Sequence, residues 1–114
     1  MDGCIFCRMV EGAAPARILF ADEEVVAFHD IAPRAPVHVL VIPRRHITSL
    51  ANTSENDRQI LGTLLLAAAE VARRTGIAET GYRVVTNNGS GAGQSVFHLH
   101  LHVLGGRKMG WPPG

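Results

Sequence analysis

Residues 97–104 read Phe-His-Leu-His-Leu-His-Val-Leu, a strict alternation of apolar residues and histidines. An alternation with a period of two predicts a β-strand, because successive side chains of a strand point to opposite faces of its sheet. We expect the two central leucines and Val103 to face a core, and His98, His100 and His102 to project from the opposite face. Neighbouring histidines on that face would lie about 6.6 Å apart, a spacing that can span a phosphate group and its two substituents.

Three chemical interpretations of this histidine row are open. As plain polar residues on a solvated face, these positions would as readily be Thr, Lys or Glu. Imidazole is the commonest metal ligand, yet ligands two residues apart on a flat strand do not converge easily on one ion. Chemistry on a phosphate uses the row best, because neutral imidazole is a competent nucleophile near neutral pH and a protonated neighbour can hold phosphate oxygens or protonate a leaving group.

The rest of the chain predicts one continuous domain over residues 1–114, without internal repeats or linkers. The five expected strands cover residues 17–21, 25–29, 37–42, 82–86 and 97–104. A short helix is expected over Ile5 to Val10, and a long one from the N-cap Ser54 to Gly76, with Asp57 completing an approximate capping box. The predicted fold class is α+β: a mainly antiparallel five-stranded sheet with one long and one short helix.

Composition excludes several classes of partner. The formal net charge of this 114-residue chain is +1 and its basic residues are scattered, which disfavours long nucleic acids and favours a small ligand. The longest apolar stretches, residues 64–69 and 37–42, are too short to span a membrane. No signal-peptide or lipidation pattern is present, so a cytoplasmic location is expected.

Two cysteines stand as Cys4-x-x-Cys7 near the N-terminus. In a reducing compartment this spacing suits metal binding or redox work better than a structural disulfide. The glycine-rich loop before residue 97 lacks the Gly-Lys-Ser/Thr ending of a P-loop, which disfavours ATP hydrolysis by that route.

Several separated motifs together resemble the histidine triad (HIT) superfamily. The pattern His-apolar-His-apolar-His-apolar-apolar over residues 98–104 is the signature of that family, and the tail Trp111-Pro112-Pro113-Gly114 is similar to its nucleotide-binding Hint branch. The other matching segments are residues 28–31, 35–43, 81–85 and 93–96, in the same order and spacing. The resemblance therefore covers nearly the whole chain and implies a HIT-like fold.

The resemblance also implies roles for individual residues. His100 matches the nucleophile that forms a nucleotidyl-histidine intermediate, which water then hydrolyses. His102 would lie beside the same phosphate, and His38 matches a histidine that carries a proton toward the leaving group. Asp30 matches the carboxylate that accepts hydrogen bonds from the ribose hydroxyls, and the alternative from its residue type alone is a helix or turn cap.

Further residues match the family's nucleotide pocket. Those expected around the purine are Ile5, Phe6, Phe28, Ile31 and Leu40, which would otherwise be read as core residues. Those expected near the phosphate are Asn87, Gly93, Gln94, Ser95 and Val96. In this loop, backbone N–H groups and the Ser95 hydroxyl would face phosphate oxygens, and the Asn87 and Gln94 amides would be additional donors.

The implied activity is hydrolysis of purine nucleoside phosphoramidates, such as adenosine monophosphate joined to an amine. Hydrolysis of dinucleoside polyphosphates is an alternative, and so is a module that binds purine nucleotides without catalysis. The resemblance further implies a homodimer in which the helix from Ser54 to Thr75 and the strand from Tyr82 contribute to the interface. Two-fold symmetry would bring Trp111 of one subunit near the nucleotide site of the other.

A structural zinc site is the remaining expectation. Two thiolates at C-x-x-C spacing bind one ion from a single turn and need two more ligands for tetrahedral coordination. His46, which aligns with a zinc ligand in cysteine-bearing relatives, and His98 are the expected partners of Cys4 and Cys7. The alternative is two reduced cysteines packed beside Phe6, with His98 free to act on the substrate.

Overall fold

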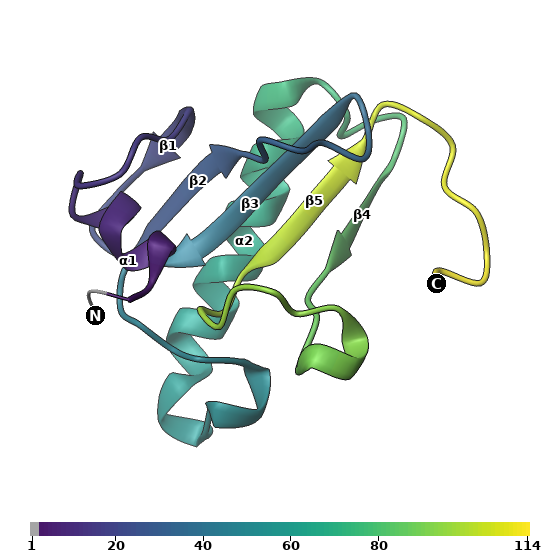
Figure 1. Ribbon diagram of the computed structural model, residues 1–114. Helices are drawn as coiled ribbons and strands as arrows, with labels where there is room; N and C mark the ends of the chain where they lie inside the picture. The colour runs from purple at the N-terminus through teal and green to yellow at the C-terminus, as the bar shows by residue number, and fades with distance from the viewer. Residues whose placement is uncertain (1–2) are drawn as a thin grey trace.

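The computed structural model of the protein describes residues 3–114 and places five antiparallel strands in one sheet (Figure 1). The strands are β1 (Ile18–Ala21), β2 (Val25–His29), β3 (Val37–Pro43), β4 (Tyr82–Val85) and β5 (Leu101–Gly105). Their order across the sheet is β1-β2-β3-β5-β4, so β1 and β4 form the edges. The helices are α1 (Ile5–Val10) and α2 (Arg58–Thr75), and short 3-10 helices cover Leu50–Asn52, Glu55–Asp57 and Ser90–Ala92. This architecture confirms the predicted α+β fold class.

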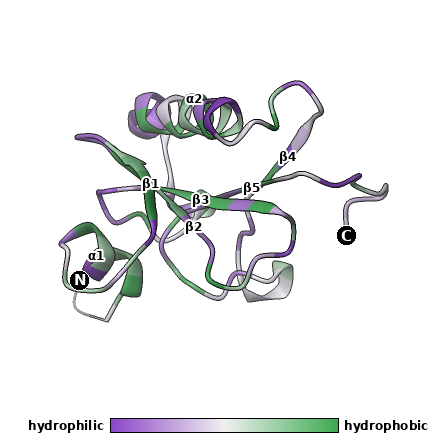
Figure 2. Ribbon diagram, turned by 90° about the horizontal axis from the view of Figure 1, so that it is seen from above, coloured by the Kyte–Doolittle hydropathy of each residue, from purple (hydrophilic) through white to green (hydrophobic). Residues whose placement is uncertain are grey.

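The two helices lie on opposite faces of the sheet (Figure 2). The main core is formed between the sheet and α2, and it contains Leu99, Leu101 and Val103, as the alternation predicted. Its other buried members are Val25, Ala27, Val39, Val41, Ile47, Leu64, Ala67, Ala68, Val71, Ala72 and Ile77. A second apolar cluster on the α1 side consists of Phe6, Val26, Phe28, Leu40 and Ile42. The central strands are thus apolar on both faces, and the α1 face is the one that also carries histidines.

The long helix begins and ends with the predicted signals. The Ser54 side chain accepts a hydrogen bond from the Asn56 N–H, and the Asp57 carboxylate accepts one from the Ser54 N–H at 2.9 Å. This capping box closes a 3-10 turn, so the α-helix itself starts at Arg58. At the other end Gly76 has a φ of 80°, the left-handed conformation that favours glycine after a helix. No helix in residues 3–114 is long and apolar enough to cross a membrane.

The predicted strand over residues 97–104 is wrong in its first half, because β5 begins only at Leu101. The neighbouring strand β3 ends at Pro43, which has no backbone N–H to continue the ladder. Other donors replace the ladder: the His98 Nε2–H donates to the Pro43 carbonyl at 2.8 Å, and the Leu99 N–H donates to the Ile47 carbonyl at 2.6 Å. His98 is therefore fully buried, while His100 and His102 line the face toward α1.

The strand register brings side chains of three strands together on that face. Phe28 of β2 is paired with Leu40 of β3, and Leu40 is paired with His102 of β5. Directly paired residues in antiparallel strands have Cβ atoms about 5 Å apart. His38 precedes Leu40 by two positions in β3 and so points to the same face. The sheet thus assembles apolar side chains and two histidines in one patch.

Candidate active site

A pocket of about 270 Å³ opens beside His100 and His102 on the α1 side of the sheet. Its lining residues are Ile5, Phe6, Met9, Phe28, Asp30, Ile31, Leu40, Ser95, Val96, His100 and His102. Apart from Met9, all of them are residues that the sequence singles out for nucleotide binding or catalysis. The pocket combines an apolar surface, suited to a purine ring, with one carboxylate and two imidazoles.

The ring of His100 is held in one tautomer. Its Nδ1 lies 2.7 Å from the carbonyl oxygen of His98, so the hydrogen bond assigns a proton to Nδ1, and in the neutral ring the lone pair is on Nε2. The rings of Phe6 and His102 flank His100 edge-to-face, with centroids 5.2 and 5.0 Å away. These contacts fix the ring orientation. The arrangement presents an unprotonated ring nitrogen, which is what a nucleophilic imidazole requires.

His38 and His102 form a short hydrogen-bonded chain behind the pocket. The Arg34 backbone N–H donates to His38 Nδ1 at 3.0 Å, which assigns the His38 proton to Nε2. That Nε2–H donates to His102 Nδ1 at 2.9 Å, so the remaining proton of His102 is on its own Nε2. Asp30 adds a carboxylate oxygen 3.4 Å from His38 Nε2.

The hydrogen-bonded pair of histidines shows how His38 is held. Both ring nitrogens of His38 are engaged within the protein, and His38 is not among the residues that line the pocket. The hydrogen bonds give His38 an orienting contact, which makes His102 a hydrogen-bond donor toward the pocket, and the expected proton transfer from His38 to the leaving group stays a prediction.

The Asp30, His38 and His102 side chains also lie close enough to hold a metal ion. The hydrogen bonds do not suit that use. An ion would have to bind His38 through Nε2, yet the Arg34 N–H occupies the Nδ1 lone pair and keeps the proton on Nε2. This cluster therefore suits histidines that carry protons better than histidines that bind a metal ion.

His38 and His102, the two hydrogen-bonded histidines, are both neutral near pH 7. Burial lowers the pKa of His38 by more than the Asp30 carboxylate raises it. Burial, together with the charges of His100 and His38, lowers the pKa of His102 to about 4. In the unfolded chain a histidine takes up its proton near pH 6.5. The unfolded state therefore binds more protons below that pH, and acid favours unfolding.

We predict that the free energy of unfolding falls as the pH decreases from about 6.5 to about 4, and that His102 contributes about 1 to 2 kcal/mol of this loss. Urea unfolding at several pH values in this range, for the native protein and His102→Gln, measures the contribution. Glutamine keeps an oxygen that can accept the His38 hydrogen bond but does not titrate. Equal pH slopes for the two proteins would contradict the prediction, because all other titrating groups are the same in both.

The loop before β5 is organised by Gln94. Its Nε2 donates to the carbonyls of Thr48 and Val96, and its Oε1 accepts the Gly89 N–H at 2.8 Å. This buried side chain is used inside the loop, and the expected contact of the Gln94 amide with phosphate stays a prediction. Gly93 has a φ of 93°, which glycine adopts readily, and it directs the chain from the 3-10 turn to Ser95.

Ser95 is the member of this loop that reaches the pocket with its side chain available, since it is exposed and lines the cavity together with Val96. Neither Asn87 nor Gly93 is among the residues that line it. Trp111 is 84% exposed and lies against Arg83, with the guanidinium carbon 6.0 Å from the ring centroid. Within one subunit the structure thus keeps Trp111 away from the pocket, and its expected contact across a dimer stays a prediction.

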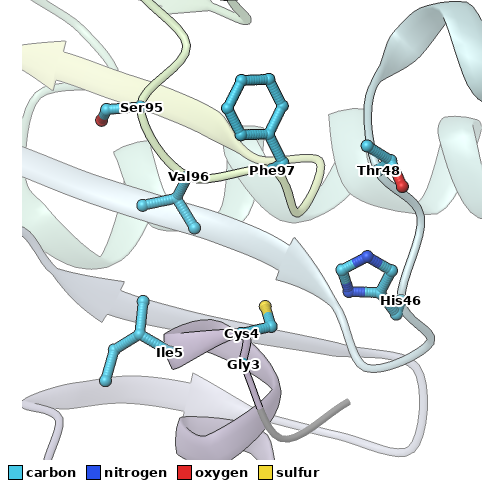
Figure 3. Close-up of a pocket in the computed structure, with 8 residues that line it drawn as sticks. All are labelled: Gly3, Cys4, Ile5, His46, Thr48, Ser95, Val96 and Phe97. Carbon is cyan, nitrogen blue, oxygen red and sulfur yellow. The ribbon is translucent and has the colours of Figure 1, made fainter.

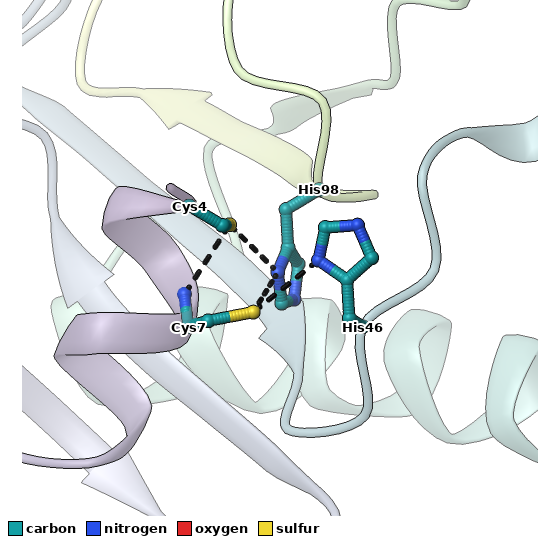
Figure 4. Close-up of side chains that lie close together, drawn as sticks. All are labelled: Cys4, Cys7, His46 and His98. Atoms are coloured by element: carbon teal, nitrogen blue, oxygen red, sulfur yellow. Dashed lines mark hydrogen bonds between the residues drawn. The ribbon is translucent and has the colours of Figure 1, made fainter. Parts of the chain in front are cut away.

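Cys4, Cys7, His46 and His98 come together from three separate segments (Figure 4). The Cys7 Sγ lies 3.2 Å from His46 Nδ1 and 3.5 Å from His98 Nδ1, and the Cys4 Sγ lies 3.4 Å from His98 Nδ1. Sulfur and nitrogen ligands of one tetrahedral zinc ion are about 3.6 Å apart, given ordinary Zn–S and Zn–N bond lengths. The spacing of the four ligand atoms therefore fits one ion.

The surroundings of His98 support the same use. Its Nε2–H donates to the Pro43 carbonyl, so the lone pair is on Nδ1, the atom that faces both sulfurs. Burial raises the pKa of the Cys7 thiol, a cost that a bound cation would offset by stabilising the thiolate. The cluster can hold a metal, and two thiolates with two imidazoles are a donor set that zinc prefers.

Comparison with known proteins identifies the family. Residues 11–109 match the HIT domain family. The chain is 48% identical over 113 residues to an uncharacterized HIT-like protein of Synechocystis sp., a match that covers 99% of this chain and 98% of the relative. The chain belongs to the HIT family. Its structure is similar to that of a HIT family hydrolase from Legionella pneumophila Philadelphia 1, with a TM-score of 0.95 and 46% identity over 97% of this chain and 99% of that one.

A more distant HIT relative is also similar in structure. It is a histidine triad nucleotide-binding protein from Candida albicans, with a TM-score of 0.82 and 32% identity over 96% of this chain and 82% of that one. Nearly the whole length of this chain is thus matched by solved proteins of the family.

Some groups that shape this HIT site are absent from the sequence-based expectations. Met9 lines the pocket from α1. Three backbone groups set the histidine tautomers: the Arg34 N–H and the carbonyls of Pro43 and His98. Met9 lies one helical turn after Ile5, so helical spacing could have indicated it. The backbone groups carry no residue-type signal, because any residue supplies them.

Proposed function

We propose that this HIT protein is a purine nucleotide-binding hydrolase of the Hint type, which cleaves nucleoside phosphoramidates through a nucleotidyl-histidine intermediate on His100. The observation that carries the proposal is the hydrogen bond from His100 Nδ1 to the His98 carbonyl, because in the neutral ring it puts the lone pair on Nε2, beside a pocket of suitable chemistry. The solved relatives named as a hydrolase and as a nucleotide-binding protein support it.

In the proposed complex the purine occupies the apolar part of the pocket, among Phe6, Phe28 and Leu40. Asp30 accepts hydrogen bonds from the ribose hydroxyls. One of its oxygens already accepts the Ala32 N–H at 2.8 Å, which holds the carboxylate in place, and ionised oxygens have further lone pairs to accept hydroxyl donors. These contacts place the α-phosphate beside the histidines.

The reaction then needs a nucleophile and donors to the phosphate oxygens. His100 Nε2 attacks the phosphorus as the bond to the leaving group breaks. His102 donates its Nε2–H to a phosphate oxygen, and the Ser95 hydroxyl offers a second donor. Because His38 fixes the tautomer of His102, this donor needs no reorientation during the reaction. Water attacks the nucleotidyl-histidine from the position that the leaving group vacates.

Charge favours phosphoramidates over dinucleoside polyphosphates. A polyphosphate chain carries several negative charges, and enzymes that bind such chains use Lys, Arg or metal ions beside them. None of the described residues that line the pocket is a lysine or an arginine. A single α-phosphate, held by neutral donors, matches the site better.

The direct test compares adenosine 5′-phosphoramidate, diadenosine tetraphosphate and AMP with the native protein. The expected result is hydrolysis of the phosphoramidate with a kcat/KM at least about a hundredfold above that of the tetraphosphate, and binding of AMP as product. A preference for the tetraphosphate would overturn the choice of substrate class. AMP binding without turnover of either compound would support the non-catalytic alternative instead.

The cysteine–histidine cluster is proposed as a structural zinc site. Cys4 and Cys7 would bind the ion from α1, and His46 and His98 from the two loops packed against it. The bound ion would supply coordination bonds that hold these segments together and no step of the reaction. His98 would then be committed as a ligand, while its backbone carbonyl continues to orient His100.

We also propose that the protein is a homodimer built on the face where α2 and β4 meet. β4 is an open edge of the sheet. Beside it lies an apolar depression of about 250 Å³ lined by Leu50, Leu61, Leu64, Leu65, Thr86, Leu99 and Leu101. Leu65 is 59% exposed there, and a second copy related by a two-fold axis would cover it.

Two adjacent leucines of α2 provide a matched test of this dimer. Leu66 is even more exposed than Leu65, but it lies on the side of α2 near Phe20 and Ala21 of β1. We predict that Leu65→Glu raises the dimer dissociation constant at least about a hundredfold and that Leu66→Glu does not change it, because only Leu65 lies in the proposed interface. Light scattering at micromolar concentration measures the mass. A monomeric native protein, or equal effects of both substitutions, would contradict the interface.

A further inference from the structure

A second cleft adjoins the proposed nucleotide pocket (Figure 3). It has a volume of about 460 Å³ and lies between the N-terminal end of α1, the loop from His46 to Thr48 and residues 95–97. Ile5, Ser95 and Val96 line both this cleft and the nucleotide pocket. The two cavities therefore meet at Ser95, the residue that would face the phosphate.

The described walls of the cleft are largely apolar. Phe97 is 48% exposed and Ile5 is 39% exposed, so both present uncovered apolar surface. The polar elements of the lining are the hydroxyl groups of Thr48 and Ser95, together with the Cys4 thiol and the His46 imidazole of the proposed zinc site. Among the described lining residues none is Asp, Glu, Lys or Arg. A carboxylate that entered this cleft would lose water without gaining a lysine or arginine partner among these described side chains.

The cleft is also held open by the loop structure. The Gln94 side chain donates to the carbonyls of Thr48 and Val96, so it ties the wall at Thr48 to the wall at Val96. Since Gln94 is buried, these hydrogen bonds are shielded from water. Walls that are already ordered spare a ligand the entropic cost of ordering them.

We propose that this cleft receives the substituent of the leaving amine and selects neutral, apolar amines over amines that carry a carboxylate. This inference rests on the phosphoramidase function proposed above. As His100 Nε2 forms its bond to phosphorus, the phosphorus–nitrogen bond breaks and its electron pair stays on the amine nitrogen. That nitrogen takes a proton from solvent and departs as the free amine past Ser95, and water then hydrolyses the nucleotidyl-histidine to release the nucleotide and restore His100.

The test uses three adenosine 5′-phosphoramidates, formed from methylamine, phenethylamine and β-alanine. The cleft predicts a kcat/KM for the phenethylamine compound at least about tenfold above that for the methylamine compound, because only the phenyl ring reaches the apolar walls. The β-alanine compound, whose carboxylate would be desolvated in the cleft, is expected to be poorer than the phenethylamine compound by a similar or larger factor.

Phe97→Ala is expected to reduce the phenethylamine-to-methylamine ratio of kcat/KM about fivefold or more, since it removes the largest apolar wall. Ile18→Ala is the matched control, because Ile18 is a similarly exposed apolar residue on the distant edge strand β1. It is expected to leave the ratio unchanged. A general loss of stability or of nucleophile reactivity would lower both kcat/KM values equally, so it would not change their ratio.

The possible results distinguish a failure of the cleft proposal from a failure of the phosphoramidase function. Equal kcat/KM values for all three compounds, or an unchanged ratio in Phe97→Ala, would overturn the role of the cleft and leave the phosphoramidase function standing. Hydrolysis of none of the three by the native protein would overturn the function and the cleft proposal together.

Discussion

Replacing His100 with alanine is expected to lower the rate of adenosine phosphoramidate hydrolysis by at least about a thousandfold, while the dissociation constant for AMP changes less than about threefold. The substitution removes the attacking nitrogen. It leaves the Asp30 carboxylate and the apolar wall at Phe28, which make the expected ribose and base contacts. Steady-state kinetics and calorimetric AMP titration measure the two quantities separately.

The control for this substitution is His29→Ala. His29 ends β2 and is only partly buried, and it is not among the residues that line the pocket. It is expected to retain native turnover, so it separates loss of the nucleophile from a general effect of removing an imidazole. Retention of about a tenth or more of the native rate by His100→Ala, a barrier change below roughly 1.4 kcal/mol, would show that His100 is not the nucleophile.

Much of the fold follows from local sequence signals. The alternation at Leu99, Leu101 and Val103 specified which face of β5 joins the core. The cap at Ser54 specified the 3-10 turn that leads into the long helix, and Gly76 specified the end of that helix. Such signals survive in the folded protein because each depends on neighbours in the chain. The start of β5 depended instead on a residue of another strand. Pro43 ends the ladder of β3, and no pattern within residues 97–104 contains that information.

In the candidate site too, sequence predicted which residue types are present but not which distant residues they contact. Family motifs supplied the residues of the pocket, including Asp30 and His100, because side-chain chemistry is visible in sequence. The hydrogen-bond partners of His38 and Gln94 were not predicted. Each role depends on which long-range partner occupies the side chain, namely His102 for His38 and the Thr48 carbonyl for Gln94. Hydrogen-bond geometry between distant segments decides such roles, and sequence gives only the list of candidates.

Loss of the metal site is expected to have the largest effect on stability. α1 is short and would be marginal alone, so contacts with the rest of the protein must hold it in place. Phe6 packs on Phe28 with ring centroids 5.4 Å apart, and Cys4 and Cys7 reach the histidines from two other segments. We predict that Cys7→Ser lowers the free energy of unfolding by about 3 to 5 kcal/mol, because it removes a ligand and leaves the others unpaired.

The same substitution is expected to weaken AMP binding at least about tenfold. Ile5 and Phe6, which line the nucleotide pocket from α1, lie between the two cysteines in the sequence, so a loss of the metal site would displace them. Atomic absorption on protein prepared without chelators measures the metal, thermal unfolding measures stability, and calorimetry measures the affinity.

Native protein is expected to hold one zinc ion per chain, and a chelator should reproduce the effects of Cys7→Ser until zinc is restored. His29→Asn, which alters a histidine outside the cluster, should retain the ion. Native protein that is supplied with zinc and holds well under one ion per chain would contradict the zinc proposal. A Cys7→Ser variant with native AMP affinity would show that the cluster does not position α1.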